Sequence, residues 1–190
     1  MITDTSDRFL YIGGSEANMI YMNYHTKTFR EWWYKKLEKI TEEIPTNQYM
    51  EVGTILEEAV IDLYERLNNV KGIRSKQAIK GIARANTDYV QGDKVSDVKV
   101  TKHASEWHKK GRVPIHYKRQ LIHYCYVLGL NKASIIAYQT NNNLINNPFQ
   151  ELDEDDLYEI EVPITSKEIE IHRQKLEYLE FCRDMNIFPS

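Results

Sequence analysis

The chain has 190 residues, a formal net charge of -3 and only two cysteines, Cys125 and Cys182, which form no CxxC motif. This length predicts a single domain over residues 1–190, and the cysteine usage excludes a zinc ribbon, a four-cysteine iron–sulfur cluster and a disulfide framework. There is no apolar run of about 18 residues and no charged-then-apolar leader, so we expect a cytoplasmic protein without a membrane segment. Any bound metal is expected to have mainly oxygen ligands.

Charge is unevenly distributed along the chain. From Lys71 to Arg119 there are thirteen Lys or Arg against four Asp or Glu, whereas from Glu151 to Glu180 eleven acids face three bases. The basic middle predicts a polyanionic substrate, since phosphate contacts dominate nucleic-acid affinity. An ordinary solvated surface is the alternative.

The first third of the chain predicts helices. The segment SEANMIYMN is expected to form a short helix with Ser15 as its N-cap, and FREWWYKKLEKI repeats apolar residues at helical spacing. A longer helix is predicted from about Gln48 to Asn68, because its apolar residues recur on one stripe. That stripe consists of Val52, Leu56, Val60, Leu63 and Leu67.

Strands follow. Residues 76–84 alternate well enough for a strand, and TDYVQGDKVSDVKV (87–100) predicts a hairpin with its turn at Gly92-Asp93. A turn centred there places Asp88 opposite Asp97, with Lys99 on the same face as Asp97. Two like charges opposite each other destabilise a sheet unless something neutralises them. Two carboxylates and one ammonium therefore predict a divalent-metal site with a helper cation.

The rest of the chain completes an α/β pattern. We expect the polar connection at residues 102–114 to be a mobile, substrate-facing loop, followed by a helix from about Pro114 that Gly129 ends. The segment KASIIAYQT predicts a strand, NNNLINNPF a turn-rich loop and LYEIEVPI a strand. The final helix starts with a capping box from Thr165 to Glu168. The predicted fold is a mixed central sheet flanked by helices, with the Asp88/Asp97 hairpin at its centre.

A set of residues within this pattern resembles the PD-(D/E)XK nuclease superfamily and, within it, the lambda-exonuclease or YqaJ-type phage recombination nucleases. The similarity extends from about Arg8 to Leu130 and implies a restriction-endonuclease-like fold. The residues that carry it are Gly53, Glu57, Asp88, Asp97, Lys99 and Gln120.

The resemblance implies a role for each of these residues. Asp88, Asp97 and the carbonyl of Val98 would bind Mg²⁺, with Mn²⁺ as a substitute, and Glu57 would help to hold a second ion. Lys99 would assist the attacking water, and Gln120 would lie beside the site. The alternatives are Glu58 in place of Glu57, a plain salt bridge between Lys99 and Asp88, and a surface position for Gln120.

The sequence departs from the family pattern at two places that bear on the geometry and metal affinity of the site. Ala85, Asn86 and Thr87 precede the first aspartate, where the family often has proline or serine. The second acid is the shorter Asp97 where glutamate is commoner, although aspartate is an accepted variant.

The resemblance also implies substrate contacts. Arg8 and Ser15 have the spacing of an arginine and a serine that hold a terminal 5′-phosphate in the exonucleases, and a helix N-terminus beside a guanidinium is an anion site. A plain helix cap at Ser15 is the alternative. The residues expected to contact DNA phosphates are Lys102, Lys109, Lys110 and Arg112.

The expected function is a Mg²⁺-dependent exonuclease that digests double-stranded DNA ends in the 5′ to 3′ direction in phage-type recombination. The resemblance further implies a homotrimer, a single-strand annealing protein as partner and, for a phage-encoded protein, the host cytoplasm as location. The rivals are an endonuclease of the same fold and a catalytically silent DNA- or partner-binding module.

Overall fold

The computed structural model describes residues 7–40 and 48–190 and is built around one six-stranded sheet. The strands occur in the order β1-β3-β4-β5-β6, and β2 also pairs with β3. Pairs β1–β3 and β4–β5 are parallel and the other pairs are antiparallel, so the predicted mixed sheet is confirmed. The strands are β1 (Ile12–Gly13), β2 (Ile73–Lys80), β3 (Ala83–Gln91), β4 (Lys94–Thr101), β5 (Lys132–Gln139) and β6 (Leu157–Glu161).

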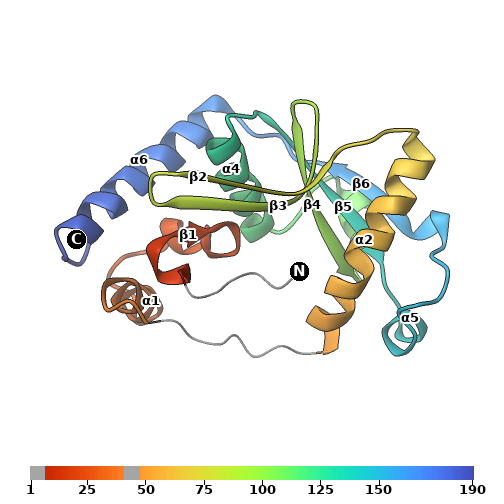
Figure 1. Ribbon diagram of the computed structural model, residues 1–190, viewed down its shortest axis with the longest axis horizontal. Helices are drawn as coiled ribbons and strands as arrows, with labels where there is room; N and C mark the ends of the chain where they lie inside the picture. The colour runs from red at the N-terminus through yellow and green to blue at the C-terminus, as the bar shows by residue number, and fades with distance from the viewer. Residues whose placement is uncertain (1–6, 41–47) are drawn as a thin grey trace.

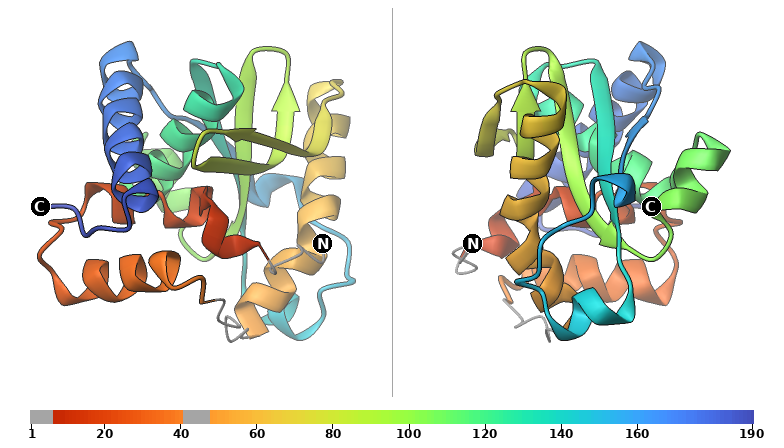
Figure 2. Two further views of the ribbon diagram at one scale, coloured as in Figure 1. Left: turned by 60° about the vertical axis from the view of Figure 1, so that its left-hand side comes forward. Right: turned by 90° about the vertical axis from the view of Figure 1, so that its right-hand side faces the viewer.

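Helices cover both faces of the sheet (Figures 1 and 2). Helix α2 lies on one side, and α4 and α6 lie on the other. The helices are α1 (Lys27–Leu37), α2 (Gln48–Asn68), α3 (Ala104–Lys110), α4 (Ile115–Leu128), α5 (Asn142–Asn146) and α6 (Ser166–Asp184). No helix in the described residues is both long and apolar enough to cross a bilayer.

The alternation of side chains along β4 and β5 builds a separate core on each face. Val98 and Ile136 join the cluster under α2, whereas Val95 and Ile135 join the larger cluster that includes residues of α4 and α6. Successive side chains of a strand point to opposite faces, so these near-continuous apolar strands serve both layers.

Several local predictions are confirmed. Helix α2 spans Gln48–Asn68, and four of its five predicted stripe residues are buried, while Leu67 is exposed. Gly129 ends α4 in the left-handed conformation, and the Thr165 hydroxyl accepts a hydrogen bond from the Glu168 amide in a complete capping box.

The predicted strand over residues 76–84 is confirmed as extended chain, but a turn divides it into the end of one strand and the start of the next. Strand β2 ends at Lys80 and β3 begins at Ala83, with Gly81 between them at a φ of 57°. Glycine adopts this left-handed conformation without steric penalty, which lets the chain reverse inside an otherwise strand-like sequence.

The predicted helix at Ser15 is wrong. Its sequence forms two short 3-10 turns, η2 (Gly14–Glu16) and η3 (Met19–Tyr21), and the N-cap of η2 is Gly13. The carboxylate of Glu16 takes the capping role by accepting from the Gly13 amide at 3.0 Å. Ser15 is exposed and caps no helix.

The connections after β4 and β5 are more ordered than expected. Residues 104–110 form α3, which buries Ala104 and Trp107, so the segment is not the predicted mobile loop. The loop at residues 141–149 contains α5, with the side chain of Asn141 as its cap. Apolar residues three apart on one helical face explain the docking of α3.

Candidate active site

The β3–β4 hairpin has the predicted register near its turn but opens at the two aspartates. Gln91 pairs with Lys94, Val90 with Val95 and Tyr89 with Ser96, and the ladder ends there. Asp88 does not pair with Asp97; its Oδ2 accepts a hydrogen bond from the Val98 amide at 2.7 Å. The strands separate because β3 continues along β2 while β4 continues along β5.

Asp97 lies at the bottom of this opening and is 1% exposed. Lys99 Nζ lies 2.5 Å from its Oδ2, and Gln120 Nε2 donates to its Oδ1 at 2.8 Å. Lys99 therefore forms an ion pair with Asp97, and not the salt bridge with Asp88 that was the alternative to its catalytic role. The Oδ2 atom is buried, and the Lys99 ammonium is its close polar neighbour.

The acids outnumber the cations that neutralise them. Burial raises the pKa of Asp88 well above its ordinary value, and the negative charges of Asp97 and Glu57 raise it further. Glu57 also has a raised pKa because of burial and of Asp97. Burial lowers the pKa of Lys99, but the neighbouring aspartates outweigh that effect and its pKa is raised. The cluster thus favours an additional positive charge.

The geometry separates the two candidate glutamates of α2. Glu58 is 59% exposed and its Oε2 lies 2.7 Å from Arg74 Nη1, whereas Glu57 is half-buried and interacts with the charges of Asp97 and Lys99. Glu57 is therefore the helix residue that joins the cluster. Space beside Gly53 is open, so that glycine is not required by close packing of the sheet.

The chemistry of the donor set suits a hard cation, although the side chains are not arranged as a complete metal site. Among the described residues, no group of three His, Cys, Asp or Glu has metal-site spacing. Asp97 Oδ2 is nevertheless a buried carboxylate oxygen whose close polar partner among the described residues is the Lys99 ammonium. Carboxylate and carbonyl oxygens are the ligands that Mg²⁺ prefers.

Tyr124 also belongs to the site, next to Gln120. Gln120 Nε2 lies 2.8 Å from the Tyr124 hydroxyl as well as from Asp97 Oδ1. Burial raises the pKa of Tyr124 well above its ordinary value, and Asp97 and Asp88 add to the shift. The i,i+4 spacing of Gln120 and Tyr124 was the available signal, since it places both on one helix face.

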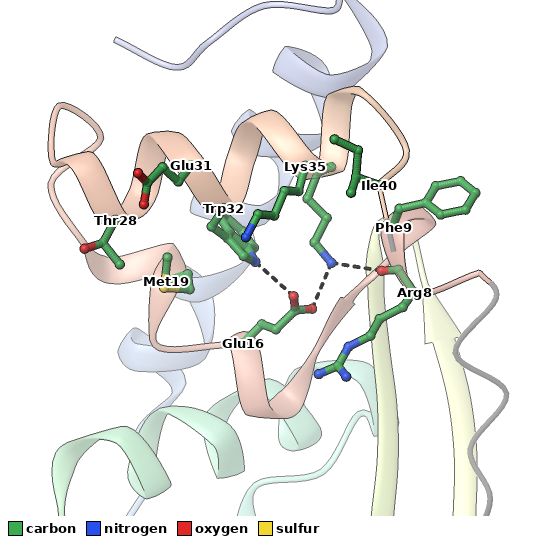
Figure 3. A pocket seen from close by; sticks show the side chains of 10 residues that line it. Arg8, Phe9, Glu16, Met19, Thr28, Glu31, Trp32, Lys35 and Ile40 are labelled. Carbon is green, nitrogen blue, oxygen red and sulfur yellow. Dashed lines mark hydrogen bonds and ion pairs between the residues drawn. The ribbon is translucent and has the colours of Figure 1, made fainter. Parts of the chain in front are cut away.

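Arg8 and Ser15 lie on segments next to α1. Arg8 begins the 3-10 turn η1 (Arg8–Leu10), and its carbonyl accepts a hydrogen bond from Lys36 Nζ at 2.9 Å. In Figure 3 a dashed contact reaches the backbone of Arg8, while the guanidinium of Arg8 lies apart from the dashed contacts. Phosphate binding by Arg8 and Ser15 stays a prediction.

A buried network holds these segments in place and was not visible in the sequence. Glu16 accepts from Trp32 Nε1 and from Lys36 Nζ, each at 2.9 Å (Figure 3). Burial lowers the pKa of Lys36, although its ion pair with Glu16 opposes the shift. Gly14 packs so tightly on Tyr124 that an added Cβ would lie 2.3 Å from the ring. The Ser15 segment thus contacts the residue that Gln120 links to Asp97.

The four predicted phosphate contacts lie on or beside α3, after β4. Lys102, Lys109, Lys110 and Arg112 are all exposed. Glu106 lies 2.5 Å from Lys110 and partly neutralises this surface. Contacts between these four side chains and DNA phosphates stay a prediction.

Comparisons with known proteins identify the fold. No family model matches the sequence, and no curated protein matches it. An alkaline exonuclease (LHK-Exo) from Laribacter hongkongensis superposes with a TM-score of 0.77 at 15% identity, covering 95% of this chain and 91% of that chain. Its complex with dAMP has a TM-score of 0.77 at 13% identity, with the same coverage.

A phage related exonuclease from Haemophilus somnus 129PT has a TM-score of 0.65 at 17% identity, covering 93% of this chain and 94% of that chain. At such identities the likeness is one of fold. The chain therefore has the α/β fold of these exonucleases, with a mixed central sheet flanked by helices.

Proposed function

We propose that this chain is a metal-dependent deoxyribonuclease that digests double-stranded DNA from its ends, in the 5′ to 3′ direction, in phage-type recombination. The observation that carries the proposal is the part-buried cluster of Asp88, Asp97 and Glu57 around Lys99, at the point where β3 and β4 separate. The shared fold with two exonucleases supports it, as does the complex of one of them with dAMP, a DNA mononucleotide.

We assign the residues of the cluster three roles: metal binding, positioning of a carboxylate and charge stabilisation. Asp88, Asp97, the Val98 carbonyl and Glu57 would hold Mg²⁺ or Mn²⁺, which when bound supplies charge neutralisation and an activated water. Gln120 holds Asp97 Oδ1 and so fixes the orientation of that carboxylate. Lys99 stays charged, because the aspartates raise its pKa, and offers positive charge to the phosphate as negative charge develops there.

Digestion of end-labelled linear duplex beside covalently closed circular DNA tests this function. We expect Mg²⁺-dependent loss of the linear substrate from its 5′ ends, no cleavage of the circle, and no product with EDTA or with Asp97→Asn. Cleavage of the circle would favour the endonuclease. Absence of acid-soluble product from both substrates would favour a silent binding module. The homotrimer and the annealing partner stay predictions from the resemblance.

A further inference from the structure

A groove of about 270 Å³ lies between α2 and the β2–β3 hairpin and reaches the acid cluster. We call it the β2–β3 groove. It shares Glu57 and Asp88 with the cluster, and the amides of Gln77 and Asn86 also line it. Gln77 and Asn86 are direct ladder partners across β2 and β3, so their side chains lie next to each other on one face.

The lining of the β2–β3 groove is acidic and rich in neutral polar groups. Glu57, Glu58 and Asp88 supply carboxylates, while Thr54 and Ser75 supply hydroxyls. None of the described lining residues is Lys or Arg. Such a groove repels a phosphate but accepts hydrogen bonds from a neutral group that carries amines and ring N–H groups, as nucleobases do.

Two unfavourable features converge on this groove. The Asn86 Oδ1 atom is buried and has no hydrogen-bond partner. Ser75 has a φ of 53° in the middle of β2, between the Arg74–Tyr89 and Lys76–Thr87 pairs and thus beside Asp88. The other non-glycine residues with positive φ in the described segments, Lys39, Asn69 and Asn186, all follow helix ends. Unsatisfied polar atoms and strained backbone concentrate where function retains them.

We infer that the β2–β3 groove receives the nucleobase of the nucleotide that is cut from the DNA end, with Asn86 and Gln77 as its contacts. The inference rests on the proposed function, because the base is placed beside the phosphate that the acid cluster would hydrolyse. A carboxamide carries both donors and an acceptor, so rotation of the amide adapts it to each of the four bases. The groove therefore binds a base without selecting a sequence, as digestion of any DNA end requires.

Equilibrium binding by the full chain in Ca²⁺ tests the inference without hydrolysis. The probes are deoxyadenosine 5′-monophosphate and 2-deoxyribose 5-phosphate, which differ by the base. We expect the wild type to bind the nucleotide about tenfold more tightly than the sugar phosphate. Asn86→Ala and Gln77→Ala should each weaken nucleotide binding by about three- to tenfold, the effect of one lost hydrogen bond, and leave sugar phosphate binding unchanged. The matched control is Gln91→Ala, at the β3–β4 turn of the same strand.

A thermal melt separates binding from folding. Because Asn86→Ala removes a buried acceptor that has no partner, its Tm should equal or exceed that of the wild type. Equal affinity of the wild type for both probes overturns the inference. So does an Asn86→Ala variant that loses affinity for both probes equally, or one whose Tm falls together with its affinity. These binding measurements do not depend on hydrolysis. Failure of the nuclease assay would therefore overturn the proposed function, while nucleotide binding by the groove could still be measured.

Discussion

Glu57 and Glu65 lie on the same helix, α2, and have opposite electrostatic surroundings. Glu65 is 3% exposed, and it accepts hydrogen bonds from Lys71 Nζ at 2.7 Å, Arg74 Nη2 at 2.6 Å and the Gly72 amide at 3.1 Å. Burial alone would raise the pKa of Glu65, but these donors lower it to about 2. Glu57 lies near Asp97 instead, and its pKa is raised.

The comparison distinguishes a carboxylate that supports the fold from one that is available for chemistry. The carboxylate of Glu65 is compensated by donors that the chain itself provides, from β2 and the turn before it. Around Glu57 and Asp88 the negative charge exceeds the positive charge of Lys99. A buried carboxylate whose charge is compensated by neighbouring donors supports the fold, whereas a buried carboxylate without enough positive charge beside it is typical of functional sites.

The largest expected effect is on hydrolysis. Asp88→Asn and Asp97→Asn should each slow digestion of linear duplex by about a thousandfold or more, because they remove several kcal/mol of charge stabilisation at the phosphate. The unfolding free energy of Asp88→Asn should equal that of the wild type or exceed it, since one of several like charges is removed. Near-wild-type digestion by both variants would contradict the assignment of the cluster.

The two glutamates of α2 should respond in opposite ways. Glu65→Gln leaves Lys71 and Arg74 without their buried counter-charge and should lower the unfolding free energy by about 2–4 kcal/mol in urea titrations. Glu57→Gln should leave stability unchanged and reduce hydrolysis. If both variants lose stability equally, the distinction between them fails.

Arg8 tests the other end of the proposed substrate path. Arg8→Ala should slow digestion of 5′-phosphorylated ends by roughly ten- to a hundredfold, the effect of a charge-assisted contact worth about 1.5–3 kcal/mol. Digestion of 5′-hydroxyl ends should change little. Arg112→Ala is the control and should slow both substrates alike. Equal slowing by Arg8→Ala on both ends would indicate general electrostatics instead of a terminal-phosphate pocket.

A buried pair of histidines has all its ring nitrogens hydrogen-bonded, and protonation at low pH would disrupt these hydrogen bonds. His123 Nε2 donates to the Arg84 carbonyl at 3.2 Å, which leaves its Nδ1 to accept from His172 Nε2 at 3.0 Å. The Tyr21 hydroxyl then donates to His172 Nδ1 at 2.8 Å. Only neutral imidazoles satisfy this chain of donors and acceptors.

Acid should therefore destabilise the protein through this pair. Burial lowers the pKa of His123 to about 4 and that of His172 to about 3. The unfolded state takes up protons below about pH 6.5, where the folded pair stays neutral, so stability falls as pH drops from about 6.5 toward 4. Urea titrations should show a loss of about 1.4 kcal/mol per pH unit for each of the two histidines in this range. His172→Gln should reduce that slope, and an unchanged slope would exclude the pair as its source.

Much of the fold follows from local sequence, because the signals act within a few residues. The apolar stripe of α2, the Gly92-Asp93 turn and the Thr165 capping box each specify a hydrogen-bonding pattern among neighbours. The same locality explains the failures. Gly81 splits a strand-like run, and the apolar face of α3 forms only where the end of the sheet covers it.

The chemical residues were predictable as a set, but their partners were not. Spacing alone placed Asp88, Asp97 and Lys99 on one hairpin. Which aspartate pairs with Lys99 depended on where β3 and β4 separate, and that point is set by their outer neighbours β2 and β5. The position of Arg74 on β2 likewise decided that Glu58 is neutralised and Glu57 joins the acids. Charge pairing acts through space between segments distant in sequence, so only the tertiary structure determines which charges are compensated.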